Sequence, residues 1–142
     1  MIKVEKSVTI NKPVNEVFAF SQSMDNYTNW QSDVASVKMD EGPDNTVGSS
    51  YTEVRKFLGR EMRTTLEITA FKENEKWAAK VVKGPVPYVV TMTYESLPEG
   101  TKISTVVEGE PKGFFKLAEN MVAKSIEDGL EKDFGKLKNL LE

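Results

Sequence analysis

The sequence contains neither cysteine nor histidine. Without cysteine the chain has no disulfide, no thiolate nucleophile and no thiolate metal ligand, which favours a reducing compartment. Without histidine it has no Ser-His or Cys-His catalytic pair, and it lacks the commonest metal ligand in proteins. No Asp-rich calcium loop is present either. We therefore expect no metal, no cofactor and a cytoplasmic location.

Long apolar runs and basic stripes are also missing. No apolar stretch approaches the roughly 20 residues that a membrane-spanning helix needs. Residues 1–10, MIKVEKSVTI, alternate in polarity, whereas a secretory signal is continuously apolar. The formal net charge is −3, with basic and acidic residues interspersed. We expect a soluble protein that neither inserts into a membrane nor binds nucleic acid.

What the sequence does contain is enough apolar material for one core. The chain has 142 residues, of which 39% are hydrophobic, and this fits a single compact domain over residues 1–142. We find no internal repeat and no low-complexity linker. We expect the domain to act as a monomer or a homodimer.

The N-terminal part reads as one strand followed by two short helices. Residues 2–10 alternate between apolar and polar, which is typical of a half-buried strand. Pro13 then suits the start of a short amphipathic helix that carries Val17 and Phe18. A second brief helix is expected over residues 24–30.

The middle of the chain predicts a sheet. Short polar or Gly/Pro-containing links separate most of its segments, and strands joined by such links must be antiparallel, because parallel neighbours need long crossovers. The expected strands are residues 34–39, 50–58, 60–71, 76–82, 88–97 and 101–108, with residues 41–48 as a loop.

After residue 113 the apolar spacing changes to that of a single long amphipathic helix running to residue 141. Gly129 and Gly135 interrupt it, and each costs about 1 kcal/mol relative to alanine in a helix interior. Either they allow close packing of the helix on the sheet, or they form a hinge.

Four segments carry a family resemblance: NKPVNEVFAFSQSMDNYTNWQSDV, GPDNTVGSSY, LPEGTKISTVVEGEPKG and the helix end LKNLLE. In this order and spacing the chain resembles, over essentially its whole length, the START-like superfamily. This superfamily includes polyketide cyclase/dehydrase and lipid-transport proteins and the birch-pollen-allergen type. The resemblance implies an α+β helix-grip fold: a seven-stranded curved antiparallel sheet, two short helices after the first strand and a long C-terminal helix.

The same resemblance implies a cavity between the concave sheet face and the long helix, which receives an apolar or aromatic molecule. Some relatives have a histidine beside the tryptophan at Trp30, where this chain has Gln31. Any mechanism that depends on that imidazole is therefore in doubt here. Trp30 would anchor the second short helix at the cavity mouth, with its N–H seeking a partner. Tyr27 would be a partly exposed brace.

On the expected strands 60–71, 88–97 and 101–108 one side is mainly apolar, and this side would face the cavity. Apolar walls with a few polar groups are typical of small-molecule sites. The alternative is that the methionines fill an irregular core. From these strands and the long helix we assign to the cavity wall Met62, Thr64, Tyr88, Met92, Thr105, Leu117 and Met121.

The strand at residues 50–58 has no plainly apolar side. If Tyr51, Glu53 and Arg55 face the cavity, burial would raise the pKa of the carboxylate, and Arg55 would hold an enolate or carboxylate. The alternative is a cross-strand ion pair on the solvated face, worth less than about 1 kcal/mol. We include Trp30, Tyr51, Glu53 and Arg55 among the candidate ligand-binding residues.

Our leading hypothesis is a protein that binds a hydrophobic or aromatic small molecule, lipid-like or polyketide-like, and we assign no catalytic residue. One alternative is a polyketide cyclase or dehydratase that acts by general acid/base chemistry in the same cavity. Another is a module that binds a protein partner through the outer face of the sheet or Phe115. Phe114 and Phe115 either close the far rim of the cavity, or one packs inward while the other covers nearby loops.

Overall fold

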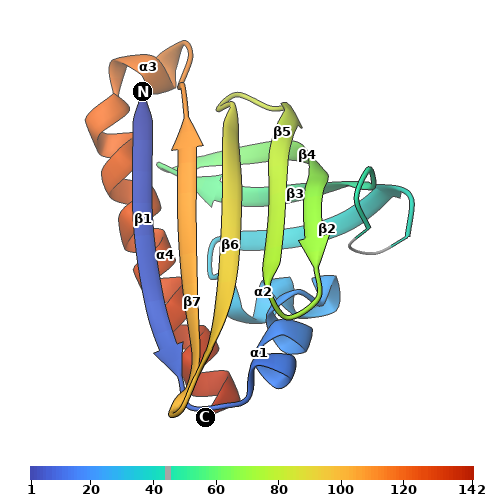
Figure 1. Cartoon of the computed structure of the whole chain (residues 1–142). Helices are drawn as coiled ribbons and strands as arrows, with labels where there is room; N and C mark the ends of the chain where they lie inside the picture. The colour runs from blue at the N-terminus through green and yellow to red at the C-terminus, as the bar shows by residue number, and fades with distance from the viewer. Residues whose placement is uncertain (44–45) are drawn as a thin grey trace.

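The computed structural model describes residues 1–43 and 46–142. Asp44 and Asn45, within the expected loop at residues 41–48, lie outside the described residues. The elements in chain order are β1 (Ile2–Ile10), α1 (Val14–Ser21), the 3₁₀ turn η1 (Met24–Asn26), α2 (Tyr27–Trp30), β2 (Val34–Glu41), β3 (Ser50–Phe57), β4 (Arg60–Lys72), β5 (Lys76–Lys83), β6 (Tyr88–Leu97), β7 (Gly100–Gly109), α3 (Phe114–Leu117) and α4 (Glu119–Leu141) (Figure 1).

The seven strands form one antiparallel sheet in the order β1-β7-β6-β5-β4-β3-β2. This is the α+β helix-grip arrangement expected from the sequence, and the six strands predicted after residue 33 differ from the observed ones by at most two residues at either end. The two edge strands, β1 and β2, both come from the start of the chain. The sheet is therefore complete only when the last strand, β7, pairs with β1.

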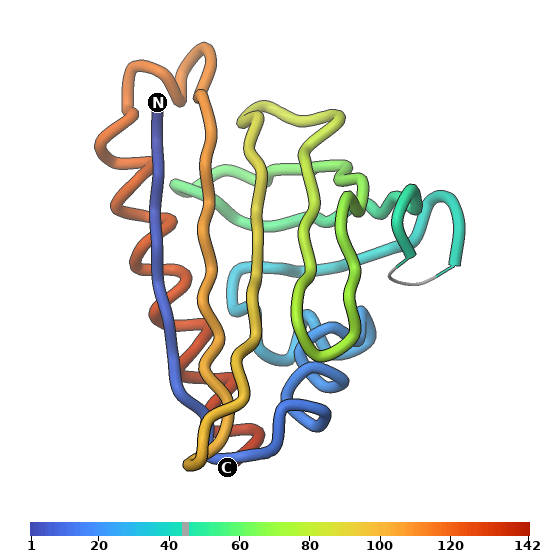
Figure 2. Tube along the Cα trace, in the orientation of Figure 1, coloured from blue at the N-terminus to red at the C-terminus, as the bar shows by residue number. Residues whose placement is uncertain are grey.

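The sheet is strongly bent. Register shifts interrupt the β2–β3 pairing and the β4–β5 pairing, and such bulges increase the local twist and bend a strand. Figures 1 and 2 show the result: β2 and β3 cross behind β5 and β6 at a steep angle. The concave face that this produces is the one that the helices meet.

The long helix α4 packs along β1 and touches α2, so it grips one edge of the concave face. It is not continuous with the turn before it. The expected single helix is broken at Ala118, which has φ −106° and ψ 29° and separates α3 from α4. Because the helical phase restarts at Glu119, the buried side of α4 carries Val122, Phe134 and Leu137.

Neither glycine of α4 is explained by close packing. A methyl group placed on Gly129 or Gly135 would meet no atom within 4 Å. Phe115 packs inward beside Val122, whereas Phe114 stays at the surface with the Arg60 guanidinium 4.0 Å from its ring centroid. Of the two alternatives for this pair, the structure shows one ring packed inward and one outside.

A buried polar network ties the short helices to the sheet. The Gln22 amide donates to the Tyr94 hydroxyl oxygen at 2.7 Å, and the Ser21 and Tyr94 hydroxyls lie 2.7 Å apart. The Tyr27 hydroxyl donates to the side-chain oxygen Oε1 of Gln22 at 3.0 Å. Tyr27 is only 3% exposed, so its expected role as a partly exposed brace is wrong: this hydrogen bond lets the ring be buried without leaving its hydroxyl unpaired.

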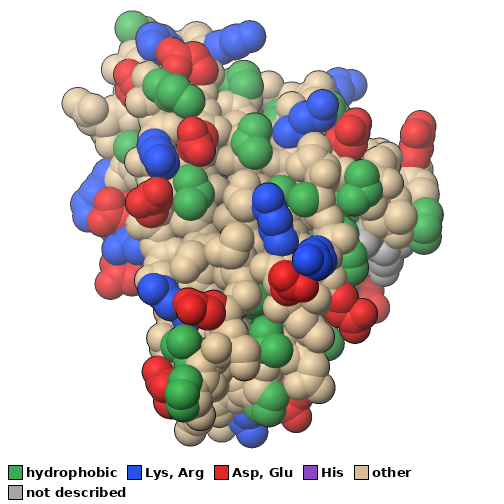
Figure 3. Space-filling model, in the orientation of Figure 1, with side chains coloured by type: hydrophobic (Ala, Val, Ile, Leu, Met, Phe, Trp, Pro, Cys, Tyr) green, Lys and Arg blue, Asp and Glu red, His purple; other side chains and the backbone are tan. Residues whose placement is uncertain are grey.

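Basic and acidic side chains are interspersed on the face of the molecule that Figure 3 shows. Most ion pairs have both partners at the surface, such as Lys124 with Asp128 at 2.9 Å. Exposed pairs of this kind contribute at most about 1 kcal/mol each. The fold therefore depends on the core and on the buried network.

We predict that Tyr94→Phe lowers the free energy of unfolding by about 1–3 kcal/mol, because the Gln22 amide and the Ser21 hydroxyl lose their buried partner. Thr93→Val, on the exposed side of the same strand, is the matched control and should change stability by less than about 0.5 kcal/mol. Denaturant unfolding of the two variants checks this. Equal losses in both would contradict a stabilising role for the network.

Candidate ligand cavity

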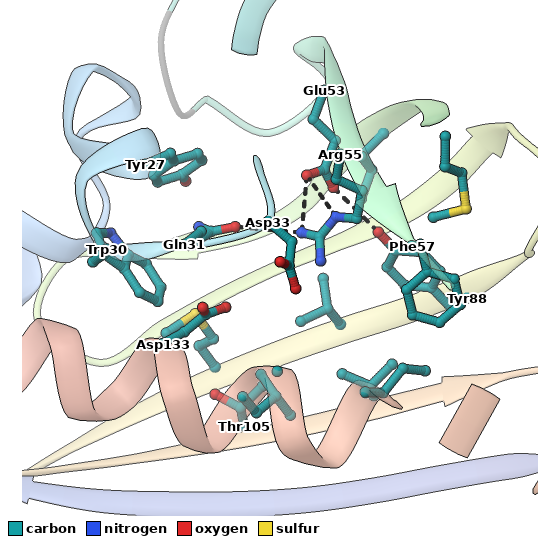
Figure 4. A pocket seen from close by; sticks show the side chains of 18 of the residues that line it. Tyr27, Trp30, Gln31, Asp33, Glu53, Arg55, Phe57, Tyr88, Thr105 and Asp133 are labelled. Carbon is teal, nitrogen blue, oxygen red and sulfur yellow. Dashed lines mark hydrogen bonds and ion pairs between the residues drawn. The ribbon is translucent and has the colours of Figure 1, made fainter. Parts of the chain in front are cut away.

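A cavity of about 130 Å³ lies between the concave face of the sheet and α4. Its walls come from α2, from β3 to β7 and from the middle of α4. Figure 4 shows 18 of the lining side chains. Half-exposed side chains of β3 and α4 line it on one side, namely Arg55, Phe57, Ile126 and Leu130, so this is where the cavity meets solvent.

Most of the residues assigned from the sequence line this cavity. On β3, the side that carries Tyr51, Glu53 and Arg55 faces inward and lines the cavity. Their part in binding a ligand stays a prediction. The assigned residues found in the wall are Trp30, Tyr51, Glu53, Arg55, Met62, Tyr88, Met92 and Thr105.

Three assigned residues are not in the wall. Thr64 is on the inner face of β4 and 1% exposed, but Gly84 passes directly over it, so it is sealed off from the cavity. Leu117 and Met121 are 91% and 62% exposed. Both assignments were wrong: Leu117 ends the separate short helix α3 and points outward, and α4, which begins at Glu119, turns Val122 rather than Met121 toward the sheet.

The main polar feature of the cavity is an ion pair on β3. Arg55 donates from Nη2 and Nε to Glu53 Oε2, at 2.9 Å and 3.2 Å. The Tyr88 hydroxyl donates to Glu53 Oε1 at 3.3 Å, and Gln31 Oε1 accepts from Arg55 Nη2 at 3.5 Å. Dashed lines in Figure 4 mark these contacts. Both oxygens of Glu53 are therefore occupied.

Burial shapes the proton equilibria of these groups. Burial of Arg55 disfavours its charged form, but Glu53 more than offsets this, and the pKa of Arg55 is held above its usual value. Burial and then the negative charge of Glu53 raise the pKa of Tyr88. Burial likewise raises the pKa of Tyr51. The tyrosines therefore stay neutral and the guanidinium stays charged at all physiological pH values.

Asp133 on α4 is a cavity residue that the sequence reasoning missed. It is 9% exposed, and its Oδ1 accepts a hydrogen bond from the Ser32 backbone N–H at 2.9 Å. Burial raises the pKa of Asp133 to about 6, although that hydrogen bond and the charge of Arg55 act in the opposite direction. One signal was available: Asp133 follows Gly129 by four residues, so both lie on one face of the helix.

Two buried polar atoms in the cavity wall have no hydrogen-bond partner: the Trp30 indole Nε1 and the Thr105 hydroxyl Oγ1. The expected partner for the Trp30 N–H is thus not supplied by the described residues. Buried polar groups are normally paired, and an unpaired one costs about 1–3 kcal/mol. The Thr105 hydroxyl therefore adds an unsatisfied polar point to an otherwise apolar wall.

Two negative findings apply to residues 1–43 and 46–142. They contain no group of three or more acidic side chains arranged to hold a metal ion. Their helices include none that is long and apolar enough to cross a membrane.

Comparison with known proteins identifies the family. A sequence model described as polyketide cyclase/dehydrase and lipid transport matches residues 1–142. The chain belongs to this family. A comparison with curated proteins gave no match.

Solved structures similar to this member of the polyketide cyclase/dehydrase and lipid-transport family agree on the fold. A START superfamily protein from Mycobacterium smegmatis has a TM-score of 0.84 at 15% identity, with 98% of this chain and 96% of that chain covered. A major latex-like protein 151 from Panax ginseng has a TM-score of 0.79 at 17% identity, with 98% and 96% covered.

The di-domain ARO/CYC BexL, from the BE-7585A biosynthetic pathway, has a TM-score of 0.80 at 15% identity. It covers 99% of this chain, which spans only 50% of the BexL chain. At these identities the likeness establishes the helix-grip fold. Members of the family are cyclases or bind hydrophobic molecules, which sets the range of functions to consider.

We predict that Arg55→Met lowers the free energy of unfolding by roughly 3 kcal/mol, because the buried Glu53 loses the cation that balances its charge and holds one of its oxygens. The double variant Glu53→Gln/Arg55→Met should recover most of this loss. Lys56→Met, on the exposed side of the same strand, is the control. Denaturant unfolding gives all three values, and a double variant less stable than Arg55→Met would contradict the account.

A second prediction concerns pH. Because folding raises the pKa of Asp133 from 3.8 to about 6, its protonated form stabilises the fold, and this contribution is lost as pH rises through that window. The stability of the natural protein relative to Asp133→Asn should therefore fall by up to about 3 kcal/mol between about pH 3.5 and pH 7. Asparagine retains the acceptor for the Ser32 N–H. A difference that does not change with pH would show that Asp133 titrates normally.

Proposed function

We propose that this protein binds a hydrophobic or aromatic small molecule in the cavity between the sheet and α4. The observation that carries the proposal is an incompletely filled cavity with mostly apolar and aromatic walls, in a fold whose long helix packs mainly along the β1 edge of the sheet. Small-molecule sites have this character: apolar walls and a few convergent polar groups. Family membership over the whole chain supports the same reading.

The size of the cavity limits the size of the ligand that it can hold. Its volume of about 130 Å³ is close to the roughly 150 Å³ of an engineered apolar cavity that binds benzene. Sites for drug-sized ligands are larger, about 300–1,000 Å³. In the conformation described, the cavity takes one aromatic ring with a small substituent, whereas a fused-ring polyketide or a long acyl chain requires α4 or β3 to move outward.

The enzymatic alternative, a cyclase or dehydratase, has less support from the geometry. General base catalysis needs a carboxylate oxygen that can reach the substrate. Both oxygens of Glu53 are already engaged, one by Arg55 and the other by Tyr88. Burial raises the pKa of Asp133 to about 6, but one of its oxygens is held by the Ser32 N–H, so an enzymatic role would rest on a single oxygen of this residue. Binding is therefore the function that the site supports best.

The test uses benzyl alcohol as a single-ring probe. Trp30 and Trp77 both line the cavity, so their indole N–H signals in a ¹H–¹⁵N spectrum report on its occupation. We expect saturable shifts of both signals, with a dissociation constant on the order of 1 mM for so small a ligand. The absence of any saturable change would contradict the proposal.

Gly129 offers a way to fill the cavity from the helix. It lines the cavity, and a side chain there meets no atom within 4 Å, so Gly129→Leu should project into the space and weaken benzyl alcohol binding at least tenfold. Gly135→Leu is the matched control, because Gly135 is an exposed glycine of the same helix with equally open surroundings.

Both variants should gain about 0.5–1 kcal/mol of stability, since leucine favours the helix more than glycine does. The stability gain shows that each variant is folded. Equal binding by Gly129→Leu and Gly135→Leu would place the probe somewhere other than this cavity.

A further inference from the structure

The carboxylates at the cavity outnumber the cations. Glu53 and Arg55 neutralise each other through two hydrogen bonds. Asp133 remains, nine-tenths buried, and the exposed Asp33 lies close enough to raise its pKa further. Figure 4 shows Asp33 and Asp133 directed toward the same space below Arg55. The electrostatic balance of this part of the wall is therefore negative.

One carboxylate oxygen of Asp133 has no hydrogen-bond donor among the described residues. Its Oδ1 accepts the Ser32 N–H, but no described residue donates a hydrogen bond to Oδ2. A carboxylate oxygen that no protein group holds is available to a charged or hydrogen-bonding group of a ligand. The cationic groups that face Asp133 are Arg55 from β3, which is held by Glu53, and Lys132, which is exposed on α4 itself.

A second observation concerns the same cavity. Thr105, on β7 and 2% exposed, lines the cavity with a hydroxyl oxygen that has no partner. A hydroxyl oxygen accepts an N–H as readily as a carboxylate does. Aromatic rings also line the cavity: Tyr27 lies edge-on to both Trp30 and Tyr51, each at 6.3 Å between centroids. Ring faces attract cations.

Building on the proposed binding function, we propose that the ligand is an aromatic molecule bearing a protonated amine, and that Asp133, with Asp33, binds the ammonium group. The ring fills the apolar part of the cavity. The ammonium N–H groups supply the donors that Asp133 Oδ2 and Thr105 lack. A carboxylate ligand is disfavoured, because Arg55 is already neutralised and Asp133 would repel it.

The experiment compares three probes with the same ring: benzylamine, benzyl alcohol and benzoate. Dissociation constants come from the Trp30 and Trp77 indole signals at neutral pH. We expect benzylamine to bind about fivefold to tenfold more tightly than benzyl alcohol, as a charge-assisted hydrogen bond implies, and benzoate to bind least tightly.

Variants test the assignment to Asp133. Asp133→Asn keeps the acceptor for Ser32 but removes the charge, so the ratio of the benzyl alcohol and benzylamine dissociation constants should fall to within about twofold of unity. Asp33→Asn, at an exposed position that does not threaten the fold, should reduce the same ratio by a smaller factor. Asp128→Asn, an exposed carboxyl of α4 paired with Lys124, is the control and should leave the ratio unchanged.

The outcomes separate this inference from the proposed function. Benzyl alcohol that binds as tightly as benzylamine overturns the amine assignment and leaves ring binding intact. A preference for benzoate overturns it as well, and assigns recognition to Arg55. If the preference for benzylamine survives in Asp133→Asn, the ammonium is bound elsewhere. If none of the three probes binds, the proposed function fails together with the inference.

Discussion

One long helix cannot cover the whole concave face of a strongly bent sheet. This constraint leaves the space in which a ligand can bind. The register shifts in the β2–β3 and β4–β5 pairings bend the sheet, and α4 packs mainly along β1, with further contacts to α2. The inner faces of β3 to β7 are left to enclose a space. Aromatic and apolar side chains narrow that space without filling it, so a volume close to that of one ring remains.

The polar groups in this space follow from the same geometry. Glu53 can be buried as a charge only because Arg55, two residues along β3, points the same way and holds it. Asp133 enters from the opposite wall, where α4 passes the end of α2, and the Ser32 N–H holds one of its oxygens. The cavity therefore has a neutral ion pair on the sheet side and an incompletely satisfied carboxyl group on the helix side.

The sequence was sufficient to predict the fold, because period-two alternation and short polar links specify antiparallel strands locally. It also placed Tyr51, Glu53 and Arg55 on one side of β3, although only the structure shows that this side faces inward. The helix was harder. The helix begins only after a break at Ala118, and its buried side carries Val122, while Met121 lies outside. Asp133 was missed because a single acidic residue on an amphipathic helix looks like part of the solvated face.

The proposed function depends on a cavity that is apolar over most of its wall and large enough to bind a small molecule. A crystal structure of the protein under xenon pressure tests it most directly, because xenon occupies apolar cavities of about this size. We expect one ordered xenon atom among Met62, the ring of Tyr88 and Leu130, which line the cavity and belong to one hydrophobic cluster. Finding no xenon there, with the side chains closed together across the space, would contradict it.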